Sequence, residues 1–357
     1  MRGCAAEREL PASVPCGAVV YLRPVTSSDD ETLELIVRQG VQVMRLSSTR
    51  AAIGSWAKRQ PDVLATRIAE LSARLDQGTK LAWASGRTLP LVMGVVNATP
   101  DSFSDGGDHA DAKAAIAHGR SLIEAGADII DVGGESTRPG ASAPSTEVEL
   151  QRVVPVVEAL APLAPLVSVD TRRAEVMAAA RDAGAAMLND VSALRHDPAS
   201  LGIAVVHDGP VVLMHMQGTP ETMQHAPRYE CAPLDVFDFL EARIAACEAA
   251  GIPRRRLIVD PGIGFGKTPA HNLEILRDLA VLRGLGCPIL VGVSRKGFIA
   301  KVAGSVAPKG RLAGSIAAAL FALGAGATII RVHDVAATRQ ALAMWTALRD
   351  GGDFGRP

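Results

Sequence analysis

The chain has 357 residues, of which 48% are hydrophobic and 21% charged, so a sizeable buried core is available and global disorder is not expected. Its net charge of −1 argues against binding nucleic acid over a broad surface, because such binding requires a basic face. The start of the chain has no basic stretch followed by an apolar core, and no apolar run reaches about 18 residues, so we expect a cytoplasmic protein without membrane contact.

Residues 1–85 differ from the rest of the chain and predict a small N-terminal α/β appendage. Residues 18–22 and 41–46 have the composition of short strands, and residues 62–75 carry apolar side chains at helical spacing, with Gly78 following as a stop signal. The appendage contains no cluster of reactive side chains, which favours a role in packing or oligomerisation over a role in chemistry.

From residue 86 to residue 350, short apolar runs alternate with stretches long enough for helices. The runs are rich in Val, Ile and Leu, which is typical of parallel strands buried on both faces. Eight strand–helix units predict an α/β fold of the (β/α)8 TIM barrel type, which needs roughly 250 residues. We expect a flexible tail at 351–357 and outer helices at about residues 110–125, 147–160, 173–183, 198–207, 234–250, 270–283, 310–323 and 335–348.

An open doubly wound sheet is the alternative fold. Such a sheet normally carries a glycine-rich dinucleotide-binding turn after its first strand. Here the first strand is followed by the residues Asn97, Ala98, Thr99 and Pro100 instead. The barrel is therefore the favoured prediction.

The apolar runs end in polar residues that are able to bind or react. Because TIM barrels build their active sites at the carboxyl ends of the strands, we expect these residues to meet at one rim. In chain order they are Asn97, Asp131, Asp170, Asn189, Asp190, His215, Asp260, Ser294, Arg295, Lys296, Arg331 and His333.

Three of these residues, Asp170, Asn189 and Asp260, suit a flat heterocycle rich in N–H donors, since each carboxylate can accept a pair of hydrogen bonds. A single aspartate at a strand end is more often a helix cap or a turn residue, so the prediction depends on all three together. The side-chain carbonyl of Asn97 is a suitable ligand for a hard cation such as Mg2+, and a turn-forming role for Asn97 is the alternative.

Cationic side chains follow the last two strands, where barrels frequently bind phosphate. Lys296, Arg331 and His333, with Arg295 beside them, therefore predict an anion site. Arg138, in the loop after the second strand, suits phosphate or carboxylate through its planar guanidinium. A solvated loop arginine is the alternative for Arg138.

Residues 260–267 read DPGIGFGK, which is rich in glycine but lacks the GxxxxGK[ST] spacing of a phosphate-binding loop. We interpret the glycines as allowing close approach to a ring, with Phe265 as one wall of its pocket. Lys267 is expected to be solvated, and His215 to be buried with its hydrogen bonds satisfied. The five cysteines are scattered without CxxC spacing, so neither a disulfide framework nor a zinc site is expected.

Eight segments, in this order, resemble the dihydropteroate synthases, pterin-binding enzymes of folate biosynthesis that sulfonamides target. They are VNATPDSFSDGG, DVGGESTRPGA, SVDT, LNDVSAL, LMHMQGTPETMQ, VDPGIGFGK, VGVSRKGF and IIRVHDV, and they span about residues 91–345. The resemblance implies a transferase that condenses 6-hydroxymethyl-7,8-dihydropterin pyrophosphate with p-aminobenzoate to 7,8-dihydropteroate and pyrophosphate by an SN1-like substitution. It also implies Mg2+ as a cofactor and a homodimer that packs late barrel helices together.

The resemblance further implies roles for individual residues. The pterin pocket would consist of Asp170, Asn189, Met214, Asp260, Phe265 and Lys296, of which Asp170, Asp260 and Lys296 would be catalytic. The pyrophosphate site would consist of Asn97, Arg331 and His333, and Asn97 would contact the metal. The p-aminobenzoate side would consist of Phe103, Thr137, Arg138, Pro139 and Lys296.

The sequence departs from the family in two places. Members commonly carry Ser or Arg after the lysine of SRK, where the side chain helps to hold the p-aminobenzoate carboxylate, whereas this chain has Gly297 and offers only a backbone N–H. The compact bacterial enzymes also lack the appendage of residues 1–85.

Two other functions are compatible with the sequence. A related pterin-binding barrel transfers a methyl group from methyltetrahydrofolate to a corrinoid protein and would share the Asp/Asn/Asp pocket, but it would not need the SRK, RVH and TRPG segments. A non-catalytic homologue, kept as a binding or regulatory partner, would be consistent with Gly297 and with the appendage. The intact set of reactive residues argues against that second alternative.

Overall fold

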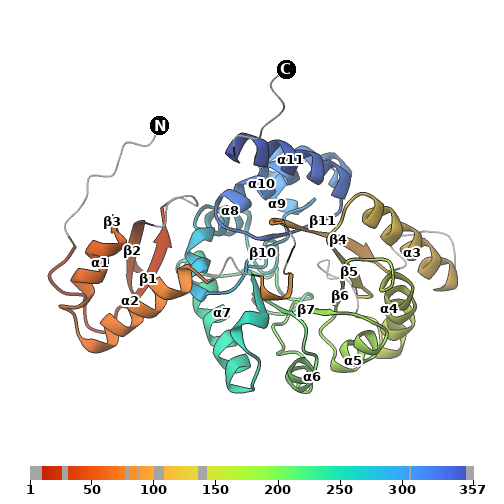
Figure 1. The fold of residues 1–357 in the computed structure, drawn as a ribbon, viewed down its shortest axis with the longest axis horizontal. Coiled ribbons are helices and arrows are strands. Elements are labelled where there is room, and N and C mark those ends of the chain that lie inside the picture. The colour runs from red at the N-terminus through yellow and green to blue at the C-terminus, as the bar shows by residue number, and fades with distance from the viewer. Residues whose placement is uncertain are drawn as a thin grey trace.

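The computed structural model describes residues 10–25, 31–77, 81–84, 86, 88–99, 108–135, 143–304 and 307–350. These residues form a barrel of parallel strands and, beside it, a three-stranded sheet with two helices (Figure 1). Among the described residues no single helix is long and apolar enough to span a membrane, although Gly297–Ala303 and Pro308–Gly324, taken together as a pair bent by 75°, meet the requirements of length and composition.

Eight parallel strands form the barrel in the order β10-β11-β4-β5-β6-β7-β8-β9, and a bridge between Val259 and Ile289 brings its two edges together. The predicted (β/α)8 barrel is confirmed. The strands are β4 (Leu91–Asn97), β5 (Ile129–Gly133), β6 (Val167–Asp170), β7 (Met187–Asp190), β8 (Val211–Met214), β9 (Leu257–Asp260), β10 (Leu290–Val291) and β11 (Ile329–Val332).

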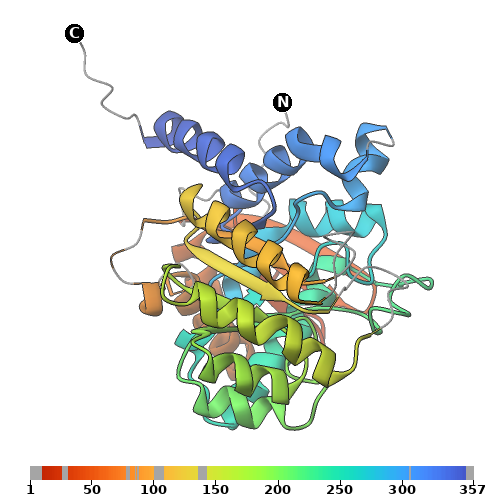
Figure 2. The same cartoon turned by 90° about the vertical axis from the view of Figure 1, so that its right-hand side faces the viewer.

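Helices surround the barrel, as Figure 2 shows for α3, α4 and α5 on one side. Side-chain caps fix several helix starts: Ser145 accepts a hydrogen bond from the N–H of Val148, and Thr268 forms a capping box with His271. The helices are α3 (Asp108–Glu124), α4 (Thr146–Leu160), α5 (Ala174–Asp182), α6 (Ser200–Val206), α7 (Ala232–Ala249), α8 (Pro269–Arg277), α9 (Gly297–Ala303), α10 (Leu312–Gly324) and α11 (Val335–Asp350). Short 3-10 helices lie at η1 (Ala82–Ala84), η3 (Arg254–Arg256), η4 (Leu279–Leu285) and η5 (Pro308–Arg311).

The helix expected at 270–283 is wrong as a single element, because α8 ends before Asp278 and the chain continues as η4. The Asp278 carboxylate is held there by the guanidinium groups of Arg23 and Arg45, both from the appendage. A 3-10 helix places every third side chain on one face. Leu279, Leu282 and Leu285 therefore form one buried row.

The appendage consists of an antiparallel sheet in the order β1-β2-β3, followed by two helices. The sequence predicted the first and third strands and the second helix, but not β2 or α1. Gly40 adopts a positive φ of 56° in the two-residue turn between β2 and β3, a conformation that glycine tolerates well. The elements are β1 (Val19–Pro24), β2 (Thr32–Gln39), β3 (Gln42–Thr49), α1 (Arg50–Ala57) and α2 (Asp62–Leu75).

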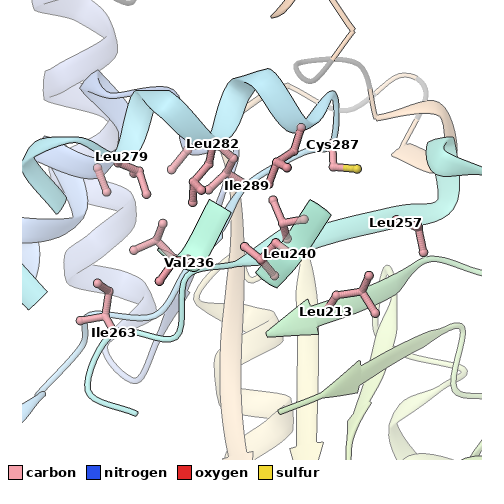
Figure 3. Packing of buried hydrophobic residues seen from close by; sticks show 14 of the residues in the cluster. Leu213, Val236, Leu240, Leu257, Ile263, Leu279, Leu282, Cys287 and Ile289 are labelled. Atoms are coloured by element: carbon pink, nitrogen blue, oxygen red, sulfur yellow. The ribbon is translucent and has the colours of Figure 1, made fainter. Parts of the chain in front are cut away.

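The appendage shares one hydrophobic core with the barrel at α7 and η4. The Tyr21 ring of β1 is fully buried and stands perpendicular to the Phe237 ring of α7 at a centroid distance of 5.2 Å. Gly284 of η4 lies between these elements, where there is little room for a side chain, since a Cβ there would lie 3.3 Å from both Leu71 and Phe237. Figure 3 shows the barrel side of this core, including Val236 and Leu240 of α7 and Leu279 and Leu282 of η4.

The barrel interior is layered, and the layers determine where the polar residues lie. Side chains from seven of the eight strands meet in one apolar cluster at the amino-terminal end, together with Ala84 of η1 and Leu81 just before it. Successive inward-facing residues of a strand are two positions apart. The next inward layer, toward the carboxyl ends, therefore consists of Asp131, Asp170, Asn189, Met214, Asp260, Gly292 and Arg331.

Candidate active site

A cavity opens at the carboxyl ends of the barrel strands, as predicted. Its lining consists of Asp170, Asn189, Val191, Met214, Asp260, Gly262, Ile263, Phe265, Gly292, Lys296 and Arg331. All six residues expected to form a pterin pocket therefore lie in one place, although they come from β6, β7, β8, β9 and two loops.

Strand register explains how residues so far apart meet. Parallel pairing places Asn97 beside Gly133, Gly133 beside Asp170 and Asp170 beside Asn189. On the other side of the barrel, Met214 pairs with Asp260.

An acidic and cationic network forms one side of the cavity. The Arg331 guanidinium donates from Nε to Asp131 Oδ2 at 2.6 Å and from a terminal nitrogen to Asp170 Oδ2 at 2.8 Å. The Asn189 amide donates to the same Asp131 oxygen at 3.1 Å. Asp131 is fully buried and thus orients both Arg331 and Asn189. The sequence placed Arg331 with the pyrophosphate ligands only, whereas here it also lines the pocket beside Asp170.

Burial raises the pKa values of two carboxyl groups in the pocket, those of Asp170 and Asp260. Desolvation raises the pKa of Asp170 to about 7, against the lowering influence of Arg331, and the nearby Asp131 carboxylate raises it further. Desolvation also raises the pKa of Asp260 to about 6, although the Gly262 N–H donates to its Oδ1 at 2.7 Å. Both groups can therefore change charge near neutral pH, which is characteristic of functional sites.

Lys296 lies opposite these carboxylates. Its Nζ is 4.1 Å from the centroid of the Phe265 ring, a cation–π contact that holds the lysine against the pocket wall. Desolvation, together with the charge of Arg331, lowers the pKa of Lys296 to about 8. Phe265 is therefore both an apolar wall and the group that positions Lys296.

The residues around His333 form a second polar cluster at the rim. The Ser294 hydroxyl accepts a hydrogen bond from the His333 N–H at 3.2 Å and lies 3.0 Å from His333 Nδ1. Desolvation lowers the pKa of His333 to about 4, so the ring is neutral at pH 7. Arg295, expected beside the anion-binding cations, instead pairs with Asp334 at 2.5 and 3.0 Å and holds the two loops together.

The expectation that Lys267 is solvated is wrong. Its side chain is buried, and its Nζ lies 2.9 Å from His215 Nδ1 and donates to the Phe265 carbonyl oxygen at 2.9 Å. The loop of residues 262–267 turns inward because three of its glycines adopt positive φ, which brings Lys267 under the pocket. The expectation for His215 is confirmed, because it is buried and has Lys267 as its partner.

Asn97 ends β4 at the same rim and is half-buried. No group of three or more His, Cys, Asp or Glu side chains able to hold a metal occurs among the described residues. Mg2+ often binds through one or two protein oxygens together with substrate phosphates and water. Asn97 therefore fits a metal that arrives with a diphosphate, and it does not fit a protein-only metal site.

A larger hollow lies in the appendage, between α1 and α2. Small and aliphatic side chains form most of its lining, and the polar side chains along it are Arg50, Lys58, Ser72 and Asp76. Arg50 and Asp76 already pair with each other at 2.9 Å. This hollow offers less chemistry than the barrel cavity, which is why we place the active site in the barrel.

The family comparison agrees with this location. A family model described as pterin binding enzyme matches residues 93–333, from β4 to the segment after β11. The chain belongs to the pterin-binding enzyme family.

Within this family the chain groups with the dihydropteroate synthases, which are transferases. The dihydropteroate synthase of Escherichia coli K12 is 48% identical over 267 residues, which cover 74% of this chain and 93% of that protein. A structure of the Xanthomonas albilineans enzyme with 4-aminobenzoic acid is 52% identical, with a TM-score of 0.69 over 73% of this chain and 93% of that chain. A structure of the same organism's enzyme with 7,8-dihydropteroate is 46% identical, with a TM-score of 0.65 and the same coverage.

Four residues expected on the p-aminobenzoate side lie outside the described residues. They are Phe103, Thr137, Arg138 and Pro139. Glu135, the last described residue before Thr137, is held in place. Its carboxylate pairs with the Arg172 guanidinium at 2.7 Å, and both side chains are more than nine-tenths buried.

Four residues that shape the cavity were assigned no pocket role from the sequence. Asp131 was noted as the end of a strand, whereas Val191, Ile263 and Gly292 were not considered. The sequence did contain a signal for Asp131. Asp131 follows Ile129 by two positions and therefore faces the same side of its strand, just as Asp260 does two positions after Ile258. Gly292 follows Leu290 by two positions in the same way. For Val191 and Ile263 the sequence holds no such signal, because both lie beyond the ends of their strands and their roles depend on loop conformation.

Proposed function

We propose that the chain condenses 6-hydroxymethyl-7,8-dihydropterin pyrophosphate with p-aminobenzoate to give 7,8-dihydropteroate and pyrophosphate. The observation that carries this proposal is the convergence of Asp170, Asn189 and Asp260 with Lys296 and Arg331 in one cavity of a pterin-binding enzyme. Solved relatives were studied with 4-aminobenzoic acid and with 7,8-dihydropteroate, which supports the same substrate and product here.

Recognition of the pterin follows from hydrogen-bond complementarity. A dihydropterin ring presents an amino group and ring N–H groups along one edge, and the carboxylates of Asp170 and Asp260 are acceptors at the corresponding side of the cavity. The Asn189 amide can both donate and accept. Met214 and Phe265 supply apolar surface for the ring faces.

The leaving group is proposed to lie toward the cationic rim, on Arg331, His333 and Asn97. Neutral His333 can donate one hydrogen bond from its ring, and the Arg331 guanidinium can donate two to a phosphate. A Mg2+ ion held by Asn97 and the diphosphate would neutralise charge on the departing pyrophosphate. The site therefore separates an acidic side for the ring from a cationic side for its leaving group.

This separation suits an SN1-like substitution. The C–O bond to pyrophosphate breaks first, the pyrophosphate keeps the electron pair, and the methylene carbon becomes a cation conjugated with the pterin ring. Ionised Asp170 and Asp260 stabilise that positive charge electrostatically in a site with little water. The amino nitrogen of p-aminobenzoate then forms the C–N bond and loses a proton.

Replacement of Asp170 tests the proposal. The Asp170→Ala variant is expected to lower kcat/KM by roughly a hundredfold or more, since removal of one preorganised charge in an active site has effects of that order. The assay measures pyrophosphate and dihydropteroate released by purified protein with both substrates and Mg2+. A folded wild-type protein that forms no dihydropteroate would contradict the proposed reaction, and wild-type kcat/KM in the variant would remove Asp170 from the mechanism.

We also propose a homodimer located in the cytoplasm. Phe321 of α10 and Met344 and Leu348 of α11 are large apolar side chains that are more than half exposed on adjacent helices, and such patches commonly mark interfaces. The four described cysteines are free, which is typical of proteins in a reducing compartment. Sedimentation of the Phe321→Asp variant as a monomer, with the wild type as a dimer, would support the interface.

A further inference from the structure

The pocket wall that carries Phe265 is held from outside by the loop between β8 and α7, residues 215–231. Three consecutive carbonyl oxygens of the wall accept hydrogen bonds from side chains. Gln224 Nε2 donates to the Gly264 oxygen at 3.0 Å, and Tyr229 Oη donates to the Gly266 oxygen at 2.7 Å. Between them, Lys267 Nζ donates to the Phe265 oxygen at 2.9 Å. The β8–α7 loop supplies two of the three donors.

The position of this wall matters for the active site. Phe265 carries Lys296 on its ring face, at 4.1 Å from the centroid. Gly264 packs against the same lysine so closely that a Cβ there would lie 3.1 Å from Lys296 Cδ. A small displacement of residues 264–266 would therefore move both an apolar wall of the cavity and the lysine that lies opposite the carboxylates.

The far end of the β8–α7 loop is tied to the start of α7. Asp235, in the first turn of α7, accepts hydrogen bonds through Oδ2 from the backbone N–H groups of Glu230 at 2.9 Å and Cys231 at 3.3 Å. These two residues directly follow Tyr229. The Asp235 carboxylate thus fixes the backbone from which the Tyr229 side chain reaches the wall.

Arg38 of the appendage holds this carboxylate. One terminal nitrogen of Arg38, at the end of β2, lies 2.7 Å from Asp235 Oδ1 and 2.9 Å from Glu230 Oε2. The Arg38 side chain is 14% exposed, and its partners Asp235 and Glu230 are 23% and 54% exposed, so the contact to Asp235 is the better shielded of the two. Its other terminal nitrogen contacts Asp238, whose carboxylate also accepts the hydrogen bond of the buried Tyr21 hydroxyl. Within the appendage, Arg38 Nε also donates to the Gly40 carbonyl oxygen at 3.2 Å, so the appendage itself helps to position the guanidinium.

We propose that Arg38 is a positioning residue for the pterin pocket, and that the appendage acts through it to hold Tyr229 and the Gly264–Gly266 wall in place. Among the ion pairs between described residues of the appendage and the barrel, those of Arg38 reach the β8–α7 loop. The others end on Asp278 or on Glu241, away from that loop. The inference rests on the proposed function, because it concerns the pocket in which the pterin binds.

A matched pair of variants in the full-length protein tests the proposal. Arg38→Met removes the contacts to Asp235 and Glu230. The control, Arg67→Met, removes another ion pair of the same interface, since Arg67 binds both carboxylate oxygens of Glu241 at 2.5 and 2.9 Å. Both variants are expected to lower the melting temperature, because each breaks ion pairing between appendage and barrel.

Only the first variant should change pterin binding. Arg38→Met is expected to raise the KM for pterin pyrophosphate roughly three- to tenfold, as long-range positioning effects commonly do. Arg67→Met should retain the wild-type KM for both substrates. Tyr229→Phe, which leaves the appendage intact, should raise the pterin KM in the same way, and Arg38→Lys should restore part of the loss.

The outcomes separate the possibilities. A wild-type pterin KM in folded Arg38→Met would overturn the proposal, and so would an equal rise in Arg67→Met, because the effect would then come from general loosening of the interface. If Arg38→Met does not fold, a wild-type pterin KM in Tyr229→Phe overturns it instead. Calorimetry with 6-hydroxymethylpterin on the wild type checks the pocket separately, since failure to bind would count against the proposed function itself.

Discussion

Lys267 offers a sensitive test of the electrostatics beneath the pocket. It is buried together with His215, and desolvation lowers its pKa from the ordinary value of 10.5 to about 7. The charge of Lys296 contributes to the lowering, whereas the Asp260 carboxylate opposes it. The perturbation is Lys267→Met, which keeps an unbranched side chain, one atom shorter, and removes the titrating amine.

The pH dependence follows from proton linkage. Between about pH 7 and pH 10.5 the unfolded chain binds a proton at Lys267 that the folded protein has largely released. The free energy of unfolding therefore rises with pH in this window. With the two pKa values above, this single group raises the stability of the wild type by about 2 kcal/mol between pH 7 and pH 9. The variant lacks this contribution.

The assay is urea unfolding of both proteins at pH 7 and at pH 9. The quantity of interest is the difference in unfolding free energy between wild type and variant, because groups that titrate alike in both proteins cancel. We expect this difference to move in favour of the wild type by about 2 kcal/mol at the higher pH. A difference that stays constant between the two pH values, or moves in favour of the variant, would refute the assignment of Lys267 as a buried amine of lowered pKa.

Two further predictions concern catalysis. Because burial raises the pKa of Asp170 to about 7 and of Asp260 to about 6, protonation on the acid side removes the charge that stabilises the cation. We expect kcat/KM for the pterin substrate to fall as the pH drops below about 7, and a profile that is flat down to pH 5 would contradict this. The Gly297→Ser variant should fold normally, since a Cβ at this exposed helix start would meet no atom within 4 Å. Its added hydroxyl is expected to lower the KM for p-aminobenzoate by roughly threefold, and an unchanged KM would show that this position does not face the carboxylate.

The order of elements and the composition of the site could be predicted from the sequence for a physical reason. In a parallel barrel each buried strand is a short apolar run, and the first polar residue after it marks the active-site rim. Asp170, Asn189 and Asp260 could therefore be selected without knowledge of the fold in three dimensions. The helix at 62–75 could be predicted with its boundaries, because apolar spacing and a stop signal are local properties.

Predictions failed where the environment of a residue is set by distant parts of the chain. Lys267 looked solvated because a lysine in a glycine-rich segment usually is, but the segment folds under β8 and brings it to His215. The helix expected at 270–283 was interrupted because Arg23 and Arg45, more than 200 residues earlier, bind Asp278. No local pattern carries such information.

The sequence by itself determined the alternation of strands and helices and the chemical types of residue at the rim, since both follow from the spacing of apolar and polar side chains. Only the tertiary structure decided that Asp131 orients Arg331 and Asn189, that Phe265 holds Lys296, and that the appendage docks on α7 and η4. These contacts depend on strand register and on the stagger of the closed barrel. Both are fixed by packing among residues that are far apart in the chain.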